Sequence, residues 1–293
     1  MDAFWIVLTG SLVAVPAALL GSVLVLRRQA MIGDAVSHAV LPGIVLAYLA
    51  TGDRASPLLL VGAAAVGLLT TLSIDGLHRR LGVRADAAIA LVYTALFALG
   101  VVLLSGYASR IDLDLDCVLF GEIAYVPLRP WLLADGTSLG PQAVWTLGGV
   151  GLLVGGWVLA RYRELHLTTF DPDFAHCTGL RPQRIHIELM ALVSLLTVAS
   201  FEAVGAVLIV ALLVVPAAAA ALLAGRFGWL LAGAAVLGVA AAAGGYTLAV
   251  AINGNIAGGI GVVAGLLFAG ALAWRFCRHR PGSVLAPTAQ TKP

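Results

Sequence analysis

Long apolar segments dominate this sequence and constrain its fold more than any other feature. A helix that crosses a bilayer needs about 20 consecutive, mostly apolar residues. Nine such segments follow one another, at residues 4–26, 33–50, 57–77, 85–107, 141–162, 185–201, 204–224, 229–251 and 256–276. Only Ser200, Glu202 and Gly205 interrupt the stretch that joins the sixth and seventh segments, so one of the two could be broken or re-entrant, and the count could be eight to ten.

Composition places these segments in lipid rather than in a water-soluble core. The chain is 61% hydrophobic and only 11% charged, and its mean hydropathy is +1.01. Alternating strand patterns are missing, which favours helices over a β-barrel. We therefore predict an all-α, polytopic transmembrane helical bundle formed by one domain at residues 1–280. Residues 281–293 are rich in Pro, Ala and Thr and are predicted to be a disordered cytoplasmic tail.

The distribution of Lys and Arg predicts the orientation of the bundle, because cytoplasmic loops retain positive charge. With the amino terminus outside and nine crossings, fourteen of the seventeen Lys and Arg residues lie on the inner side. The outer loops keep only Arg54, Arg110 and Arg129. The first segment carries Asp2 and no Lys or Arg ahead of it, so we expect a retained helix rather than a cleaved signal peptide. These features predict a multi-pass membrane protein.

Several functions are disfavoured by what the chain lacks. A net charge of +2 with scattered Arg residues offers no basic groove for a nucleic acid. Cys117, Cys177 and Cys277 form no CxxC pair, which disfavours a disulfide framework or a thiolate zinc site. The single lysine, Lys292, lies in the tail, so the chain has no Walker A loop, and ATP-driven transport would need a separate ATPase subunit.

Two loops are longer than ordinary connections and are candidate functional segments. The outer loop, residues 108–140, carries the alternating carboxylates Asp112, Asp114 and Asp116, followed by Glu122. The inner loop, residues 163–184, has signals for a short helix along the cytoplasmic face. Thr169 or Asp171 could cap this helix, Pro172 fits its first turn, and Gly179 could end it.

Ionisable residues within membrane spans are costly and usually functional. Asp34 and His38 lie four residues apart, so on a helix they share one face and could hold one cation together. A carboxylate with an imidazole suits manganese, iron(II) or zinc better than copper(I). The alternative is that Asp34 caps the second helix and His38 bonds to a neighbour, and both interpretations stay open. Asp75 and Asp86 flank an Arg cluster and are interpreted as salt-bridged or solvated.

Glu202 is predicted to lie at the outer end of its helix, where it could be a gate or entry carboxylate or a solvated turn residue. A rise of about 1.5 Å per residue places Asp34 and His38 in the inner half of the bilayer. Glu202 would therefore join their site only if a helix is broken.

Four motifs in one order resemble the manganese, zinc and iron permease family of ABC importers, which implies a location in the bacterial cell (inner) membrane. The resemblance extends from Leu12 to Arg275 and is carried by residues 24–28 followed by 33–43, and by residues 114–122, 170–175 and 204–217. The runs at 116–122 and 201–205 look like the manganese-type branch. Members of this family are membrane subunits that work with a cytoplasmic ATPase and an extracytoplasmic metal-binding protein.

The resemblance implies a dimer of permeases, either identical or paralogous, that encloses one translocation path. It implies that Asp34 and His38 belong to the metal-handling helix, and that manganese, or alternatively zinc or iron, is transported without a permanently bound cofactor. It also implies that the inner loop docks on the ATPase through a coupling helix, with Phe170, Asp171, Pro172, Asp173, Phe174 and Gly179 as the residues concerned.

Two other classes of function fit the sequence less well. An ion-coupled secondary metal transporter or channel would be expected to show an inverted repeat with paired broken helices, and the two halves show no convincing similarity. A membrane-embedded hydrolase needs a nucleophile with a base or a metal-bound water, and His38 lies beside Ser37 without a second histidine.

Overall fold

The computed structural model describes residues 2–51, 57–107, 123–128, 130–132 and 138–278. This part contains nine helical spans that are long and apolar enough to cross a membrane, which confirms the predicted all-α polytopic bundle. One span comprises two helices, α2 and α3, and the long helix α10 contains two spans, while α8 and α9 are too short to span. The α-helices of the described residues are α1 (Asp2–Leu26), α2 (Met31–Ala39), α3 (Leu41–Thr51), α4 (Pro57–Leu81), α5 (Ala85–Tyr107), α7 (Gln142–Ala160), α8 (Tyr162–Phe170), α9 (Pro172–Cys177), α10 (Pro182–Leu223), α11 (Phe227–Ile252) and α12 (Ile256–Arg278).

The outer loop contains local structure that the sequence did not predict. A short 3-10 helix, η2 (Ile123–Leu128), precedes two strands, β1 (Pro130–Leu132) and β2 (Ser138–Pro141). The strands pair in an antiparallel hairpin. Residues 108–122 and the tail from 279 lie outside the described residues, so the predictions made for Asp112, Asp114, Asp116, Glu122 and residues 281–293 remain predictions.

The second span is divided into α2 and α3, where the sequence predicted one helix at 33–50. Val40 separates the two helices, and Pro42 lies in the first turn of α3. Proline has no amide hydrogen to donate to the carbonyl four residues earlier, and its ring crowds that carbonyl. The chain therefore restarts its helical hydrogen bonds at this point, with Gly43 and Ile44 both donating to the Val40 carbonyl.

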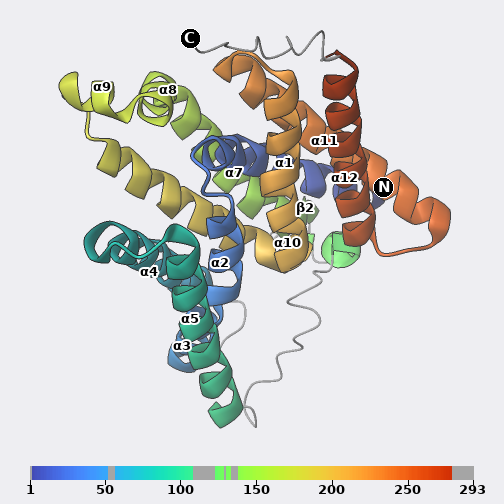
Figure 1. Cartoon of the computed structure of the whole chain (residues 1–293). Helices are drawn as coiled ribbons and strands as arrows, with labels where there is room; N and C mark the ends of the chain where they lie inside the picture. Colours follow the sequence, from blue (N-terminus) through green and yellow to red (C-terminus); the bar gives the residue numbers. More distant parts are fainter. Residues whose placement is uncertain (1, 52–56, 108–122, 129, 133–137, 279–293) are drawn as a thin grey trace, which may run out of the picture.

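Helix α10 contains two spans joined at a break. A straight helix of its 42 residues would be roughly 63 Å long, about twice the hydrocarbon thickness. Gly205 has φ 77° and ψ 167°, a conformation that glycine adopts without the cost of a Cβ atom. The chain descends from α9, turns back near the α10 label in Figure 1 and returns alongside α1. The interruption predicted at Ser200, Glu202 and Gly205 is thus a reversal of the chain at Gly205.

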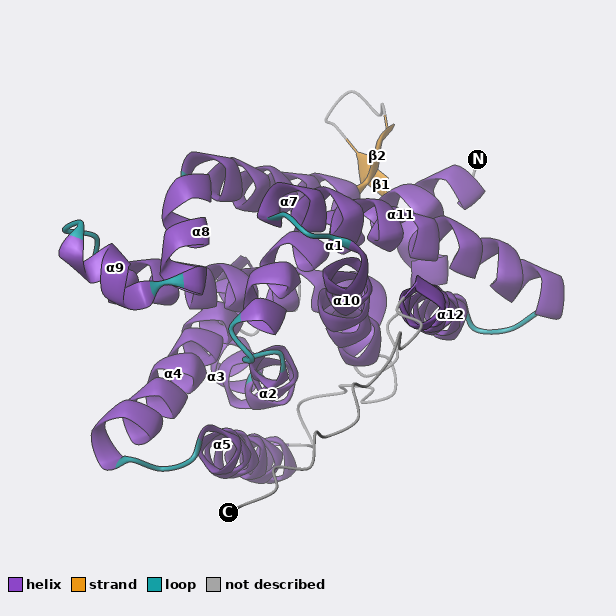
Figure 2. Ribbon diagram, turned by 45° about the horizontal axis from the view of Figure 1, so that its top comes forward, coloured by secondary structure: helices purple, strands orange, loops and turns teal. Residues whose placement is uncertain are grey.

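The spans form two packed groups (Figures 1 and 2). Helices α2, α3, α4 and α5 pack on one another and form the first group. Helices α1, α7, α10, α11 and α12 form the second, and α10 packs against both α2 and α4. The two groups therefore contact each other mainly through α10.

Close helix packing in this bundle depends on small residues, as expected where lipid supplies no hydrophobic force between helices. A Cβ atom on Gly21 of α1 would lie 1.7 Å from the Leu213 carbonyl oxygen of α10. A Cβ atom on Gly245 of α11 would lie 2.2 Å from the Cα of Ile260 in α12. At both positions, backbone atoms of the neighbouring helix occupy the space that any larger side chain would need.

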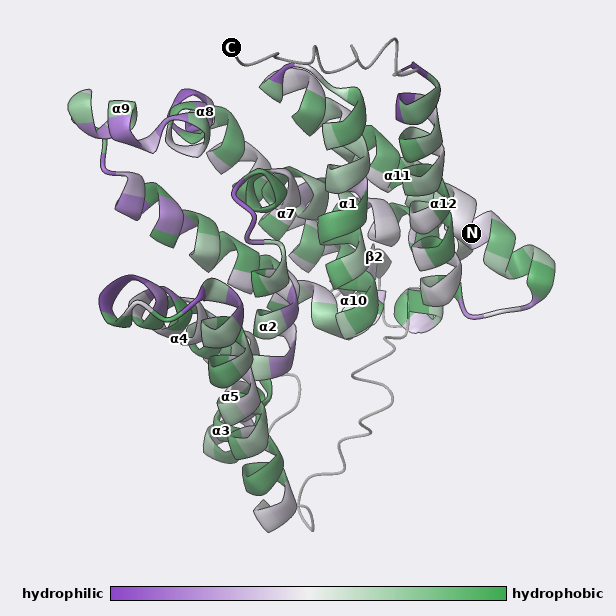
Figure 3. Cartoon of the chain, in the orientation of Figure 1, coloured by the Kyte–Doolittle hydropathy of each residue, from purple (hydrophilic) through white to green (hydrophobic). Residues whose placement is uncertain are grey.

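Side-chain contacts bring the arginine-rich helix ends to one side of the bundle. Arg27, after α1, donates to Thr169 of α8. Asp75, near the end of α4, contacts Gln183 at the start of α10. Tyr162 of α8 packs on Phe227 at the start of α11. Figure 3 shows hydrophilic residues gathered at α8, α9 and the α4–α5 turn, as the predicted orientation requires for the cytoplasmic side.

Candidate functional site

Asp34 and His38 share one face of α2, as their spacing predicted. His38 Nε2 lies 3.6 Å from Asp34 Oδ1, close enough for an ionic contact but too long for a good hydrogen bond. Helix α2 begins at Met31, and Asp34 lies inside its first turn rather than at its cap. The alternative role of Asp34 as a helix cap is therefore wrong.

The surroundings of this pair are apolar on one side and open on the other. The rings of Tyr93 and Phe97, both from α5, have centroids 6.2 Å from that of His38. The opposite face of α2 is buried, and Val36 is fully enclosed there. Yet 43% of the Asp34 side chain and 37% of the His38 side chain remain exposed. Charged groups at this depth do not face lipid without a large cost, so another polar surface or water must cover them.

Within the described part of the chain, no group of three or more His, Cys, Asp or Glu side chains is placed to hold a metal ion. Asp34 and His38 thus form a two-residue set in a single copy of the chain. Glu202 lies in α10, three residues before the break at Gly205, and its side chain is not described. Structural metal and ion sites usually use more ligands than two.

The inner loop forms the predicted short helix, α9, with the predicted termini. Asp171 is the cap, and its Oδ1 accepts a hydrogen bond of 2.9 Å from the Phe174 amide. Pro172 occupies the first turn. At the other end Gly179 has φ 81°, and the Gly179 and Leu180 amides donate to the carbonyls of His176 and Ala175. This is the bonding pattern of a Schellman motif, which satisfies the carbonyls left free at a helix end.

Two aromatic side chains of this segment extend outward. Phe170 ends α8 and Phe174 lies in α9, and each is more than half exposed. The Phe170 ring also packs against the rings of His166 and Phe227, and its contact with Phe227 joins the end of α8 to α11. The α8–α9 surface is thus a capped helical platform on which both rings remain more than half exposed.

Arg27 anchors this platform to α1. It donates through Nη2 to Thr168 Oγ1 at 2.9 Å and through Nε to Thr169 Oγ1 at 3.2 Å. Burial lowers the pKa of Arg27 to about 10, and the charge of Arg79 acts in the same direction. The guanidinium still carries its charge at neutral pH. The sequence alone gave no signal for this contact, because the partners are more than 140 residues apart.

Two polar clusters near the start of α10 were not predicted as functional. In one, Glu188 Oε2 accepts a hydrogen bond of 2.9 Å from the Trp157 indole, and Arg161 pairs with both Glu164 and Glu188. The hydrogen bond to Glu164, followed by the charges of Glu188 and Glu164, raises the pKa of Arg161. In the other, Asp75 contacts Arg79, as predicted, and also Gln183 and His186. His186 is a buried second histidine within a span, which the sequence analysis overlooked.

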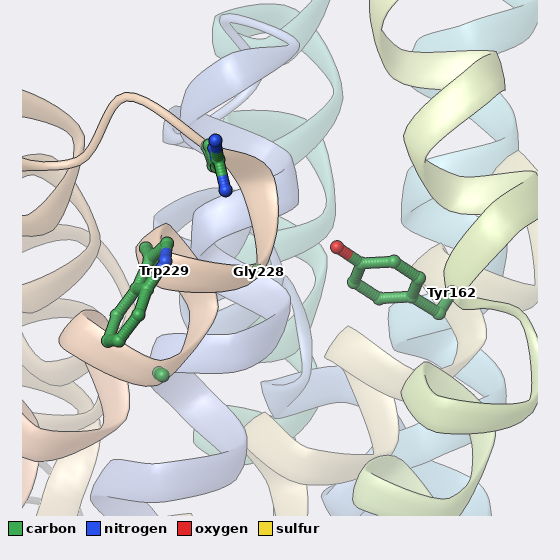
Figure 4. A pocket seen from close by; sticks show the side chains of 5 residues that line it. Tyr162, Gly228 and Trp229 are labelled. Atoms are coloured by element: carbon green, nitrogen blue, oxygen red, sulfur yellow. The ribbon is translucent and has the colours of Figure 1, made fainter.

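A surface hollow of about 420 Å³ lies elsewhere, between α8 and α11. Its lining residues are Tyr162, Arg226, Gly228, Trp229 and Ala232. In Figure 4 the Tyr162 hydroxyl points toward Gly228 across the hollow. Neither Asp34 nor His38 lines it, so it is separate from the candidate metal residues.

A bundle of nine apolar spans, with a polar pair inside one span and a capped helical platform at the arginine-rich end, defines a polytopic membrane permease. The model of the ABC 3 transport family matches residues 3–275, so this chain belongs to that family. Family membership identifies it as the permease component of an ABC transporter, and the ion-coupled secondary transporter considered above is not supported.

Curated relatives and a solved structure agree with the family. The manganese transport system membrane protein MntD of Bacillus subtilis is 44% identical over 267 residues, which cover 91% of this chain and 90% of the relative. The zinc transport system membrane protein TroD of Treponema pallidum is 40% identical over 90% of this chain and 71% of its own length. The structure of PsaBC from Streptococcus pneumoniae in complex with Fab superposes with a TM-score of 0.75 at 27% identity, covering 92% of this chain and 90% of that one.

Proposed function

We propose that this chain is the membrane-spanning subunit of an ATP-driven importer for manganese. The observation that supports this most directly is the 44% identity, over nearly the whole of both chains, with a relative named as a manganese transport protein. A relative named for zinc is 40% identical. Zinc is therefore the cargo against which manganese has to be tested, with iron as a further candidate.

The candidate ligands agree with this cargo. Asp34 offers carboxylate oxygens and His38 an imidazole nitrogen, a combination that suits manganese, iron(II) or zinc. Neither described cysteine, Cys177 or Cys277, belongs to a cluster that could bind a soft metal. Selectivity between neighbouring divalent metals depends on coordination number and geometry, and two side chains of one copy do not define either.

We infer that a second permease, an identical chain or a paralogue, completes the path. The half-exposed carboxylate and imidazole need a polar covering in the bilayer. A two-fold dimer uses the same surface patch on both subunits, so if α2 lies beside the axis, its two copies would bring two carboxylates and two imidazoles together. Such a set of four ligands is sufficient for a transported divalent cation. Glu202, before the break in α10, is proposed as a gate carboxylate at the outer end.

The cytoplasmic ATPase is proposed to dock on α8 and α9, with Phe170, Asp171, Pro172, Asp173, Phe174 and Gly179 forming or shaping the contact. The exposed rings of Phe170 and Phe174 support this assignment, since aromatic side chains supply much of the binding energy in protein interfaces. On the other side of the membrane, Asp112, Asp114, Asp116 and Glu122 are proposed to attract the cation released by an extracytoplasmic metal-binding protein.

The proposal is tested by reconstituting the permease with its ATPase in vesicles that contain ATP on the cytoplasmic side. We expect uptake of radioactive manganese that requires ATP and the metal-binding protein, and that excess zinc inhibits less than excess manganese does. Equal transport with an ATPase variant unable to hydrolyse ATP would contradict the importer assignment. ATP-dependent uptake of zinc but not manganese would contradict the choice of cargo alone.

A further inference from the structure

Asp75 lies at the junction between the two groups of helices. It belongs to α4, in the first group, and its side chain is only 14% exposed. Its Oδ2 accepts a hydrogen bond of 2.9 Å from Gln183 Nε2. Its Oδ1 lies 3.6 Å from Nε2 of the buried His186 and also accepts from Arg79. Gln183 and His186 both lie in the first turns of α10, in the second group.

The contact of Asp75 continues as a polar seam between α4 and α10. Deeper in the bundle, Ser194 of α10 donates to the Ala64 carbonyl of α4 at 3.0 Å. The two helices approach closely there, because a Cβ atom on Gly67 would lie 2.1 Å from Ser194 Oγ. Because the boundary is closely packed at this point, we expect a shift at the start of α10 to displace α4 as well.

This polar seam lies between the proposed ATPase contact at α9 and the metal-handling helix α2. Only residues 178–181 separate α9, the proposed ATPase contact, from α10. Helix α4 in turn packs on α2, which carries Asp34 and His38. We propose that Asp75 is a positioning residue that couples α9 to the metal-handling helix through Gln183 and His186. This inference rests on the proposed docking of the ATPase at α8 and α9.

The start of α10 also offers a matched control on its other side. Glu188 lies one turn beyond Gln183 and makes polar contacts of the same kind, with Trp157 and Arg161. These partners belong to α7 and the turn that follows it, inside the second group. Loss of the Glu188 contacts would loosen the start of α10 without breaking its link to α4. Asp75 and Glu188 variants therefore separate transmission between the groups from local stability of α10.

The first experiment measures manganese transported per ATP hydrolysed in the reconstituted transporter. We expect Asp75→Ala and His186→Ala to lower this ratio at least tenfold, with complex assembly and ATP hydrolysis retained. The double variant should fall no further than the single variants, because both remove one link. Glu188→Ala should stay within twofold of wild type. Ratios within twofold for Asp75→Ala, or an equal loss in Glu188→Ala, would overturn the inference. Gln183→Ala removes the more exposed partner if Asp75→Ala does not assemble.

The second experiment does not depend on the cargo. Hydrogen–deuterium exchange is compared with and without ATP and vanadate in the full complex. In wild type we expect a change at α9, at the start of α10, and at residues 57–81 and 31–39. In Asp75→Ala the change should persist at α9, disappear from residues 57–81 and become smaller at residues 31–39, which α10 also contacts directly. A full change retained at residues 57–81 in the variant, or no change there in wild type, would overturn the inference even if the wild-type protein transports no manganese.

Discussion

Asp34 and His38 are the residues whose environment is hardest to reconcile with a single chain in lipid. They lie on a helix that crosses the membrane, they are only 3.6 Å apart, and about two fifths of each side chain is open. The same two residues would be an ordinary ion pair on a water-soluble surface. Within a membrane span an uncovered charge is costly, which supports the proposal that these residues line a polar path.

We expect Asp34→Asn and His38→Gln each to abolish most manganese uptake while leaving expression and assembly normal. Each substitution keeps hydrogen-bonding capacity and removes a charge or an imidazole nitrogen. Loss of a coordinating group should cost at least the roughly 10–100-fold that loss of an outer-shell partner costs. ATP-dependent uptake in vesicles is the measurement.

The control for this pair is Ser37→Ala. Ser37 lies between the two residues on the buried face of α2 and donates to the Gly33 carbonyl at 2.9 Å. Its loss should leave uptake within about twofold, because a helical serine contributes little beyond that one bond. Wild-type transport by both Asp34→Asn and His38→Gln would show that the pair has no part in handling the metal.

At the scale of helices, packing depends on glycines at a few specific contacts rather than on all 34 in the chain. Gly245 touches the backbone of α12, whereas a Cβ atom on Gly261 of α12 would meet no atom within 4 Å. The two positions therefore allow one substitution to be compared in a closed and an open environment.

We expect Gly245→Ala to destabilise the bundle by about 1–3 kcal/mol, since a methyl group there forces α11 and α12 apart. Gly261→Ala should be neutral or slightly stabilising, because alanine has the higher helix propensity. Thermal unfolding of the detergent-purified protein measures the difference. A lower melting temperature for Gly261→Ala than for Gly245→Ala would contradict the contact.

The ends of helix α9 are set by residues of its own sequence, and its proposed role in ATPase docking depends on its exposed face. We expect the double variant Asp171→Arg with Phe174→Ala to uncouple transport while the protein stays in the membrane, because it changes both the cap and an exposed ring. ATPase binding and metal uptake are the measurements.

Two single variants separate these contributions. Asp171→Ser retains an oxygen at the cap, whose complete loss typically costs about 1 kcal/mol, so it should bind the ATPase nearly normally. Phe174→Ala keeps the cap and should weaken binding. Normal assembly and uptake in the double variant would remove α9 from the ATPase interface.

At the scale of the whole molecule, the predicted topology separates charge between the two sides. The arginines gather with α8 and α9, while the carboxylates Asp112, Asp114 and Asp116 alternate in the predicted outer loop. A divalent cation approaching from outside would meet negative potential first, which raises its local concentration.

Replacement of Asp112, Asp114 and Asp116 by Asn should slow uptake, most strongly at low manganese concentration and low ionic strength, where screening is weakest. Initial uptake rates over a range of metal and salt concentrations provide the test. If a normally expressed variant shows an unchanged dependence of uptake rate on manganese concentration, these carboxylates only keep the loop soluble.

Local physical chemistry made much of this protein predictable from its sequence. Apolar length alone located the nine spans, because a helix in lipid must satisfy its own backbone hydrogen bonds. The termini of α9 followed from Asp171, Pro172 and Gly179, because caps and left-handed turns depend on neighbouring residues. The shared face of Asp34 and His38 followed from helical periodicity.

Other features were decided only by the tertiary structure. The packing of the Tyr93 and Phe97 rings of α5 beside His38, and the direction that the chain takes after Gly205, depend on which helices pack together. Asp75 meets Gln183 across 108 residues of chain, and no short-range pattern contains that pairing. Apolar helices in a bilayer are nearly interchangeable by composition, so their neighbours are chosen by shape, small-residue contacts and a few buried polar bonds.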